Sequence, residues 1–211
     1  MPIQFASEVL KPWDELNHLT AQPLALDPQI SDIARLTVAL ANAINHTADR
    51  IAVGQNIIHL NQVRAFKGQL HILSKEYRLI SDVSDMAKHG TLKSPSRKNK
   101  IQVVSLFEWC AVRGFRFIRN SILISHAEEG DFDFLETSLA SILFLMSEMD
   151  ITPSWSKTIC ESSEPFRPQA ALLFDSRYCI QMNAVKLQFL SRSDSGSYTP
   201  CNPPQIDFVV L

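Results

Sequence analysis

The feature that most constrains this fold is a long apolar repeat that begins at Val63 and ends at Gly90. Apolar residues recur at alternating steps of three and four, which places them along one face of an α-helix. Further apolar residues beside that face predict a mostly buried helix. Gly90 is typical of a helix end, because glycine adopts the left-handed conformation at low cost. The residues on the face are Val63, Phe66, Leu70, Leu73, Tyr77, Ile80, Ser84 and Ala87.

A second helical repeat precedes the first. It runs through Ile30, Ile33, Thr37, Leu40, Ile44, Ala48 and Ile51, and it ends where Gly54 and Asn56 interrupt the pattern. We therefore expect two long helices, at about 28–53 and 60–89, that form an antiparallel pair. A short helix at about 6–19, interrupted near Pro12, is the most that the N-terminal residues indicate.

Beyond Pro95 the pattern changes to short runs rich in Val, Ile and Phe. Residues 101–109 and 115–126 alternate as two strands, and the segment 110–114 has the length and the glycine of a hairpin loop. A helix over 101–126 is the alternative, since Val103, Leu106, Cys110, Phe117 and Ile122 also fall near one face. We favour the strands.

One more helix and three more strands complete the prediction. Asp133 is a capping residue with Glu136 three positions later, so a helix is expected at about 133–149. The segments 170–175, 179–190 and 206–211 are typical of strands, and a polar loop at 191–204 separates the last two.

These elements predict an α+β fold in which the N-terminal helix pair packs with an antiparallel sheet formed by the middle and C-terminal segments. We divide the chain into a helical part, 1–95, and a strand-rich part, 96–211, within one compact domain.

Composition excludes several classes of protein. The chain has 211 residues, of which 45% are hydrophobic and 20% charged, an ordinary globular balance, and its net charge of -2 excludes a generally basic protein. The N-terminus lacks the features of a signal peptide, and no apolar run is long enough to span a bilayer. We therefore expect a soluble, cytoplasmic protein without contact to a membrane. The four cysteines lack the spacing of a zinc site, and no cofactor or metal is expected.

A positive cluster follows the long helix. It consists of Lys88, His89, Lys93, Arg97, Lys98 and Lys100. Such a cluster can contact the phosphate groups of a nucleic acid, or it can be a solvated loop, which we favour. Asp82 and Asp85 lie beside Lys88 near the helix end and predict an ion-paired helix face rather than a metal site.

Arg119, Asn120 and His126 form the only pattern with a catalytic meaning. An arginine, a polar residue and a downstream histidine resemble the motif of the HEPN superfamily, helical-bundle proteins that include many RNases. The resemblance covers residues 119–126. It implies a metal-independent RNase in which histidine moves a proton and arginine stabilises the charge on the phosphate, at a dimer interface.

The spacing of Arg119 and His126 provides a test of this resemblance. On a helix, residues seven positions apart share a face, whereas on a strand an odd separation sends them to opposite faces. The strand prediction therefore argues against the RNase, and Arg119 would instead form a surface salt bridge. We expect a non-enzymatic binding or accessory protein that acts through a protein partner or a homo-oligomer, with nucleic acid as a further partner, and the RNase is the alternative.

Overall fold

The computed structural model describes residues 2–23, 29–152, 157–172 and 186–210. Contacts group the chain into two compact units. Unit 1 consists of Met1–Leu16, Arg35–Ile101 and Ile124–Ile159, and unit 2 consists of Asn17–Ala34, Gln102–Leu123 and Cys160–Leu211. The division of the chain at about residue 95 remains a prediction. None of the described helices is long and apolar enough to cross a membrane.

The N-terminal residues are helical over a longer stretch than the sequence predicts. Helix α1 (Pro2–Phe5) continues into a π-helical turn, η1 (Ala6–Leu10), and then into α2 (Lys11–Thr20). Pro12 has no N–H group with which to bond the carbonyl of Glu8. The π-turn, in which the N–H of Lys11 bonds the carbonyl of Ala6, places the wider turn directly before the proline, so that the helix continues through it.

The two long helical repeats form three helices rather than two. Helix α3 (Gln29–Gly54) agrees with the prediction from residue 29 onward, and position 28 lies outside the described residues. The predicted helix at 60–89 is wrong in one respect, because Ser74 adopts an extended conformation and divides it into α4 (Leu60–Leu73) and α5 (Lys75–His89). The hydroxyl of Ser74 accepts a hydrogen bond from the N–H of Tyr77 and so caps α5. Gly90 ends α5 in the left-handed conformation, as predicted.

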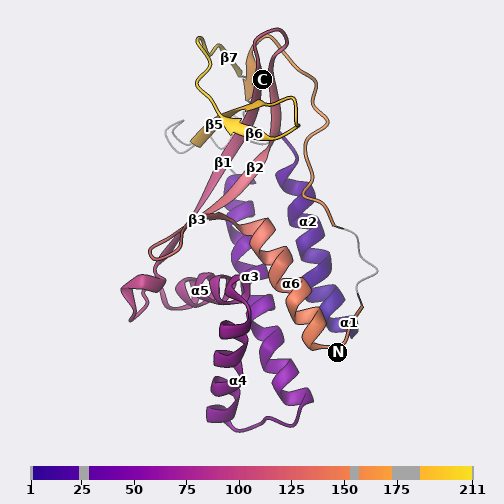
Figure 1. The fold of residues 1–211 in the computed structure, drawn as a ribbon, viewed down its shortest axis with the longest axis vertical. Coiled ribbons are helices and arrows are strands. Elements are labelled where there is room, and N and C mark those ends of the chain that lie inside the picture. Colours follow the sequence, from indigo (N-terminus) through magenta and orange to yellow (C-terminus); the bar gives the residue numbers. More distant parts are fainter. Residues whose placement is uncertain (1, 24–28, 153–156, 173–185, 211) are drawn as a thin grey trace. The chain divides into compact units, whose positions relative to one another are not determined.

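This division changes which apolar residues are buried. In α5, Tyr77, Leu79 and Ile80 lie in the core, whereas Ile72 and Leu73 of α4 are 85% and 67% exposed. The prediction of a mostly buried helix is therefore wrong for α4, in which Leu70 is the buried residue. Helix α4 lies beside α3 (Figure 1), where Lys67 bonds the carboxylate of Asp49 at 3.1 Å.

The core of unit 1 lies between α5 and α6 (Phe134–Glu148). Asp133 caps α6 as predicted, since its Oδ1 atom accepts hydrogen bonds from the N–H groups of Leu135 and Glu136. The buried indole of Trp13 donates hydrogen bonds to the Leu135 carbonyl at 3.3 Å and to the Ser138 hydroxyl at 3.0 Å. These bonds fix the N-terminal helical segment against α6 and satisfy a polar group that burial would otherwise leave unpaired.

The strand prediction for 101–126 is confirmed. Strands β1 (Asn99–Cys110) and β2 (Gly114–His126) run side by side (Figure 1), and the helical alternative is wrong. Gly114 has a φ of +86°, and a Cβ atom there would lie 2.2 Å from the carbonyl oxygen of Arg167. Only glycine therefore fits where the backbones of Phe115 and Arg167 exchange two hydrogen bonds of 2.8 Å.

The α+β fold class is confirmed, but the sheet is not wholly antiparallel. Five strands follow the order β3-β2-β1-β5-β6, with β3 (Gly130–Asp133), β5 (Lys186–Arg192) and β6 (Tyr198–Pro200). Strand β5 pairs with β1 in parallel. Strands β4 (Ala170–Leu172) and β7 (Phe208–Val210) form a separate parallel pair. Residues 173–175, 179–185 and 211 of the predicted strands lie outside the described residues.

Phenylalanine side chains form the core of unit 2. Phe107, Phe115 and Phe117 are at most 5% exposed and pack with Ala170. Phe189 of β5 lies opposite Phe107 in the parallel register, with their ring centroids 5.8 Å apart. Complete burial of one such side chain contributes about 1.5–3 kcal/mol. The aromatic cluster therefore explains why β5 pairs with β1.

Candidate functional site

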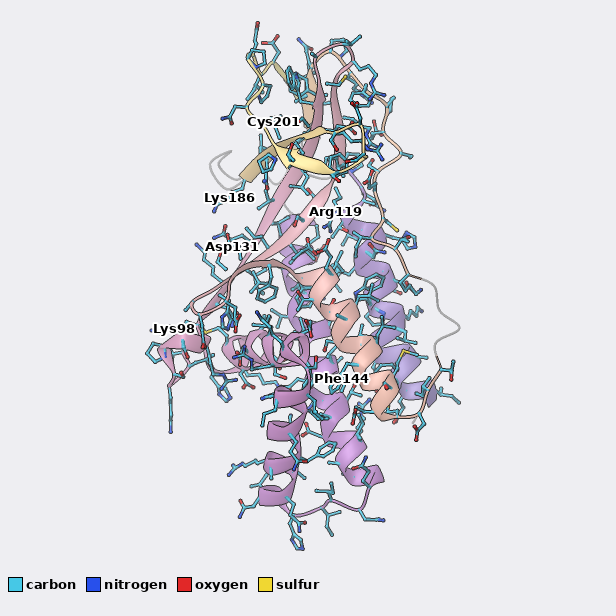
Figure 2. The ribbon with its side chains drawn as sticks, in the orientation of Figure 1. Lys98, Arg119, Asp131, Phe144, Lys186 and Cys201 are labelled. Atoms are coloured by element: carbon cyan, nitrogen blue, oxygen red, sulfur yellow. The ribbon has the colours of Figure 1, made fainter. Side chains whose placement is uncertain are left out.

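The positive cluster extends from the end of α5, through η2 (Pro95–Arg97), to the start of β1. We call residues 91–100 the basic loop. Lys93, Lys98 and Lys100 are exposed, whereas Arg97 is partly buried. Figure 2 labels Lys98 directly after η2, in the segment that connects α5 to β1. The loop is thus ordered by a short helix rather than formed by an irregular chain alone.

Arg97 fixes the basic loop to α5. Its Nε atom donates to Asp82 Oδ1 at 2.5 Å, and one terminal nitrogen donates to Asp85 Oδ2 at 2.7 Å. The side-chain amide of Asn99 adds a bond of 3.0 Å to the carbonyl of Asp82. Burial opposes the charge of Arg97, but the hydrogen bonds to the two aspartates outweigh it and raise its pKa. Arg97 is therefore an anchor, and its guanidinium is already bound to carboxylates.

Asp82 lies at the centre of this network and is 1% exposed. In addition to Arg97, it contacts the ring of His126, whose Nε2 atom lies 3.3 Å from Asp82 Oδ2. Burial of a carboxylate is costly unless hydrogen bonds and opposite charge compensate it. The aspartates do form an ion-paired helix face, as predicted, but the partner is Arg97 of the loop.

Both ring nitrogens of His126 are engaged. Nδ1 accepts hydrogen bonds from the N–H groups of Glu128 and Glu129, at 3.3 and 3.2 Å, so the proton of the neutral ring is on Nε2 and is donated to Asp82. The side chain of His126 is fully buried. A general base must reach the proton that it removes, so this geometry lends no support to the RNase hypothesis.

The other two residues of the HEPN-like motif lie in unit 2, in the interior of β2. Arg119 is 8% exposed, so the expectation of a surface salt bridge at this residue is wrong. Asn120 is fully buried; its Oδ1 atom accepts a 2.7 Å bond from Ser105, and its Nδ2 atom donates to the carbonyl of Gln22 at 3.2 Å. Asn120 therefore connects β1, β2 and the residues after α2.

A cleft of about 610 Å³ opens beside the basic loop. It is lined by Asp85, His89, Thr91, Leu92, Lys93, Ser94 and Arg97. In the described part of the chain, no ion pair engages the ammonium groups of Lys93, Lys98 or Lys100. The loop thus presents three exposed ammonium groups from a base that Arg97 holds in place.

Lys88 and His89, at the end of α5, differ in their surroundings. The ammonium group of Lys88 lies 3.3 Å from His46 Nε2 of α3. His89 is exposed and lines the cleft. Both residues stand at the negative end of the dipole of α5, where a positive charge is favoured. The structure thus places His89 beside the basic loop and directs Lys88 toward α3.

No family model matches this chain. Nor does any curated protein or solved structure. The resemblance to the HEPN superfamily thus rests on residues 119–126 alone. Among the described residues, no group of three or more histidines, cysteines or carboxylates could hold a metal ion.

Two groups of interacting side chains do not appear in the sequence pattern. The pairing of Asp82 and Asp85 with Arg97 was missed, although all three are charged residues near one helix end. A second network lies in unit 2, where Arg116 bonds Glu108 at 2.8 Å, Glu161 at 3.0 Å and the hydroxyl of Tyr198 at 2.8 Å.

This second network is internally paired. Burial opposes the charge of Arg116, but the hydrogen bonds to Glu108 and Glu161 outweigh it and raise its pKa. Burial, followed by the negative charge of Glu161, raises the pKa of Tyr198. Because each charge has a partner, we interpret the network as a structural connection between β1, β2 and β6.

Proposed function

We propose that this chain is a non-enzymatic binding protein that holds the phosphate backbone of a nucleic acid with the basic loop and acts together with a protein partner. The observation that carries the proposal is that one cation of the loop is ion-paired to α5 while three others are exposed. Arg97 is bound to Asp82 and Asp85, and Lys93, Lys98 and Lys100 are exposed. A loop fixed in this way loses less conformational entropy on binding than a free one.

The carboxylate of Glu129, in the turn after β2, is already paired with cations, which supports the same proposal. The N–H of Ala127 bonds the carbonyl of Lys98, so the turn that follows β2 lies beside the loop. In this turn, the carboxylate of Glu129 pairs with Lys75 at 2.5 Å and also with Arg78. These hydrogen bonds, that of Lys75 first, lower the pKa of Glu129. Because two cations neutralise it, Glu129 repels an approaching phosphate only weakly.

The protein-partner part of the proposal is supported by apolar side chains that α3, α4 and their connection leave exposed. They are Val53, Ile58, Leu60, Ile72 and Leu73, between 60% and 85% exposed. Single exposed apolar residues are ordinary, but several on one helical pair are typical of an interaction surface. Replacement of Ile72 and Leu73 by lysine should release a bound protein or a second copy, which size-exclusion chromatography with light scattering measures.

The test of nucleic-acid binding compares two double variants of equal charge. Lys93→Ser with Lys98→Ser removes two proposed contacts, and the matched control, Lys11→Ser with Arg64→Ser, removes two exposed cations elsewhere in unit 1. Fluorescence anisotropy with RNA and DNA oligonucleotides is measured at several salt concentrations. Each lost contact should reduce the log–log salt slope by about 0.7 for single strands.

The expected result is weaker binding with a smaller slope for the loop variant and unchanged binding for the control. Equal binding by both variants would refute the basic loop as the contact surface. The same protein is incubated with mixed RNA in the absence of divalent metal. Cleavage that disappears in a folded His126→Ala variant would refute the non-enzymatic proposal and support the RNase.

A further inference from the structure

In unit 2, the side chains of Asn17 and His18 both lie within hydrogen-bond distance of the sulfur atom of Cys160. The Nδ2 atom of Asn17 lies 3.3 Å from Cys160 Sγ, and the Nδ1 atom of His18 lies 3.7 Å from it, both within the hydrogen-bond range of sulfur. Asn17 and His18 are neighbours near the end of α2, and Cys160 lies outside the described helices and strands. No sequence spacing predicts this cluster, because its members are far apart along the chain.

The orientation of the Asn17 amide is fixed by the backbone. Its Oδ1 atom accepts a 2.9 Å hydrogen bond from the N–H of Cys160, which leaves its NH2 group directed at the sulfur. Asn17 is 3% exposed, whereas Cys160 is partly exposed and His18 is exposed. The sulfur of this partly exposed residue is thus held by a buried amide and lies next to an exposed imidazole.

This arrangement is suited to the chemistry of a thiolate. Thiolate, not thiol, is the nucleophile, and a neighbouring imidazole activates cysteine by accepting its proton. The donated N–H of Asn17 favours the negative charge on sulfur once the proton has left. Asn17 bonds the sulfur rather than the imidazole, so it does not orient His18 as the third member of an acyl-transfer triad does. A small reagent that approaches from solvent is therefore the better match than a large acyl substrate.

We propose that Cys160 is a thiol that reacts with hydroperoxides, with His18 as its general base. In the reaction, His18 takes the proton of the thiol, and the sulfur attacks the distal oxygen of the hydroperoxide. The S–O bond forms as the O–O bond breaks, and the leaving alkoxide or hydroxide takes the proton from His18. The products are a sulfenic acid and an alcohol or water, so the sulfur is oxidised by two electrons and the peroxide is reduced.

The same groups stabilise the product. The oxygen of the sulfenic acid can accept a hydrogen bond from the side-chain N–H of Asn17, and its O–H can donate to the neutral imidazole of His18. Cys110 and Cys201, the other free cysteines among the described residues, differ in their surroundings. The pKa of Cys201 is raised by burial, and that of Cys110 is lowered chiefly by a hydrogen bond from Arg113. Within the same protein, Cys201 therefore serves as a reference thiol with a raised pKa and Cys110 as one with a lowered pKa.

The experiment treats the full-length reduced protein with hydrogen peroxide in the presence of dimedone and follows labelling of each cysteine by peptide mass spectrometry. We expect Cys160 to be labelled at least about tenfold faster than Cys201. His18→Asn should remove most of this difference and leave the labelling of Cys110 unchanged. The matched control, His59→Asn, removes an exposed histidine of unit 1 and should have no effect.

Two readouts separate general-base catalysis from a structural role of His18. Circular dichroism should show the same melting temperature for His18→Asn and the parent protein. The rate of Cys160 labelling between about pH 5 and 8 should depend on pH differently in the two proteins, because only the parent has the imidazole. Labelling of Cys160 at the rate of Cys201, or at an equal rate in a folded His18→Asn variant, would overturn the proposal.

Discussion

Replacement of Arg97 by glutamine tests whether this residue anchors the basic loop. The change removes the positive charge between Asp82 and Asp85 and leaves His126 as the described side-chain partner of the buried Asp82 carboxylate. Loss of one partner from a buried ion pair costs about 3–5 kcal/mol. Since the side chain of Arg97 is 36% exposed, water compensates part of this loss, and we expect the free energy of unfolding to fall by about 2–4 kcal/mol.

Urea denaturation followed by circular dichroism measures this change, with Lys98→Gln as the matched control. Lys98 is exposed and lies next to Arg97 in the chain, so its replacement should change stability by less than about 0.5 kcal/mol. Nucleic-acid binding by the two variants further distinguishes the roles of Lys98 and Arg97. Lys98→Gln should reduce the salt slope for single strands by about 0.7, whereas Arg97→Gln should weaken binding with little change in slope. Equal stabilities of the two variants would refute the anchor.

Three further predictions concern single residues. Ser74→Ala removes the cap of α5 and should lower the free energy of unfolding by about 1 kcal/mol in urea titrations, and an unchanged value would refute the capping role. Gly114→Ala places a Cβ atom 2.2 Å from the carbonyl oxygen of Arg167 at a φ of +86°, so it should lower the melting temperature, whereas the parent value would show that the strands can move apart. The thiol of Cys110 should react with iodoacetamide at lower pH than free cysteine, since hydrogen bonds from Arg113 lower its pKa. Arg113→Gln should shift the midpoint of this pH profile upward, and an unshifted midpoint would contradict that cause.

Local signals predicted the elements whose ends are set by local chemistry. Gly90 and Asp133 end and begin helices because of backbone conformation and side-chain capping, which act over a few residues. The strands β1 and β2 were recognisable for the same reason, since their runs of Val, Ile and Phe are a local property of the sequence. The fold class followed from these elements.

Elements that depend on distant contacts were not predictable in this way. The apolar repeat continues through Ser74 without interruption, and only the position of the core decides that Tyr77 is buried while Ile72 is exposed. The parallel pairing of β1 with β5 is set by the contact of Phe107 with Phe189, which no local pattern encodes. The apolar periodicity of a sequence shows that a side chain packs against apolar residues, but it does not identify those residues.

The candidate site shows the same limit. The charge cluster that contains Lys93, Lys98 and Arg97 was visible in the sequence, but the distinction between anchor and exposed cation depends on where Asp82 lies. His18 has no cysteine near it in the sequence, and the fold brings it to Cys160. Site residues separated by most of the chain length become visible only through the fold.

The parallel pairing of β5 with β1 also affects the order in which the molecule can be assembled during synthesis. Strand β1 can pair with β2 as soon as both have left the ribosome. The other edge of β1 stays unpaired until β5, which is translated much later, has also left the ribosome. An unpaired strand edge is a template for association with other chains. A nascent or truncated chain without β5 would carry this edge open, with Phe107 beside it deprived of its aromatic neighbour Phe189. Strand β5, once it is made, thus protects the open edge of β1 against aggregation.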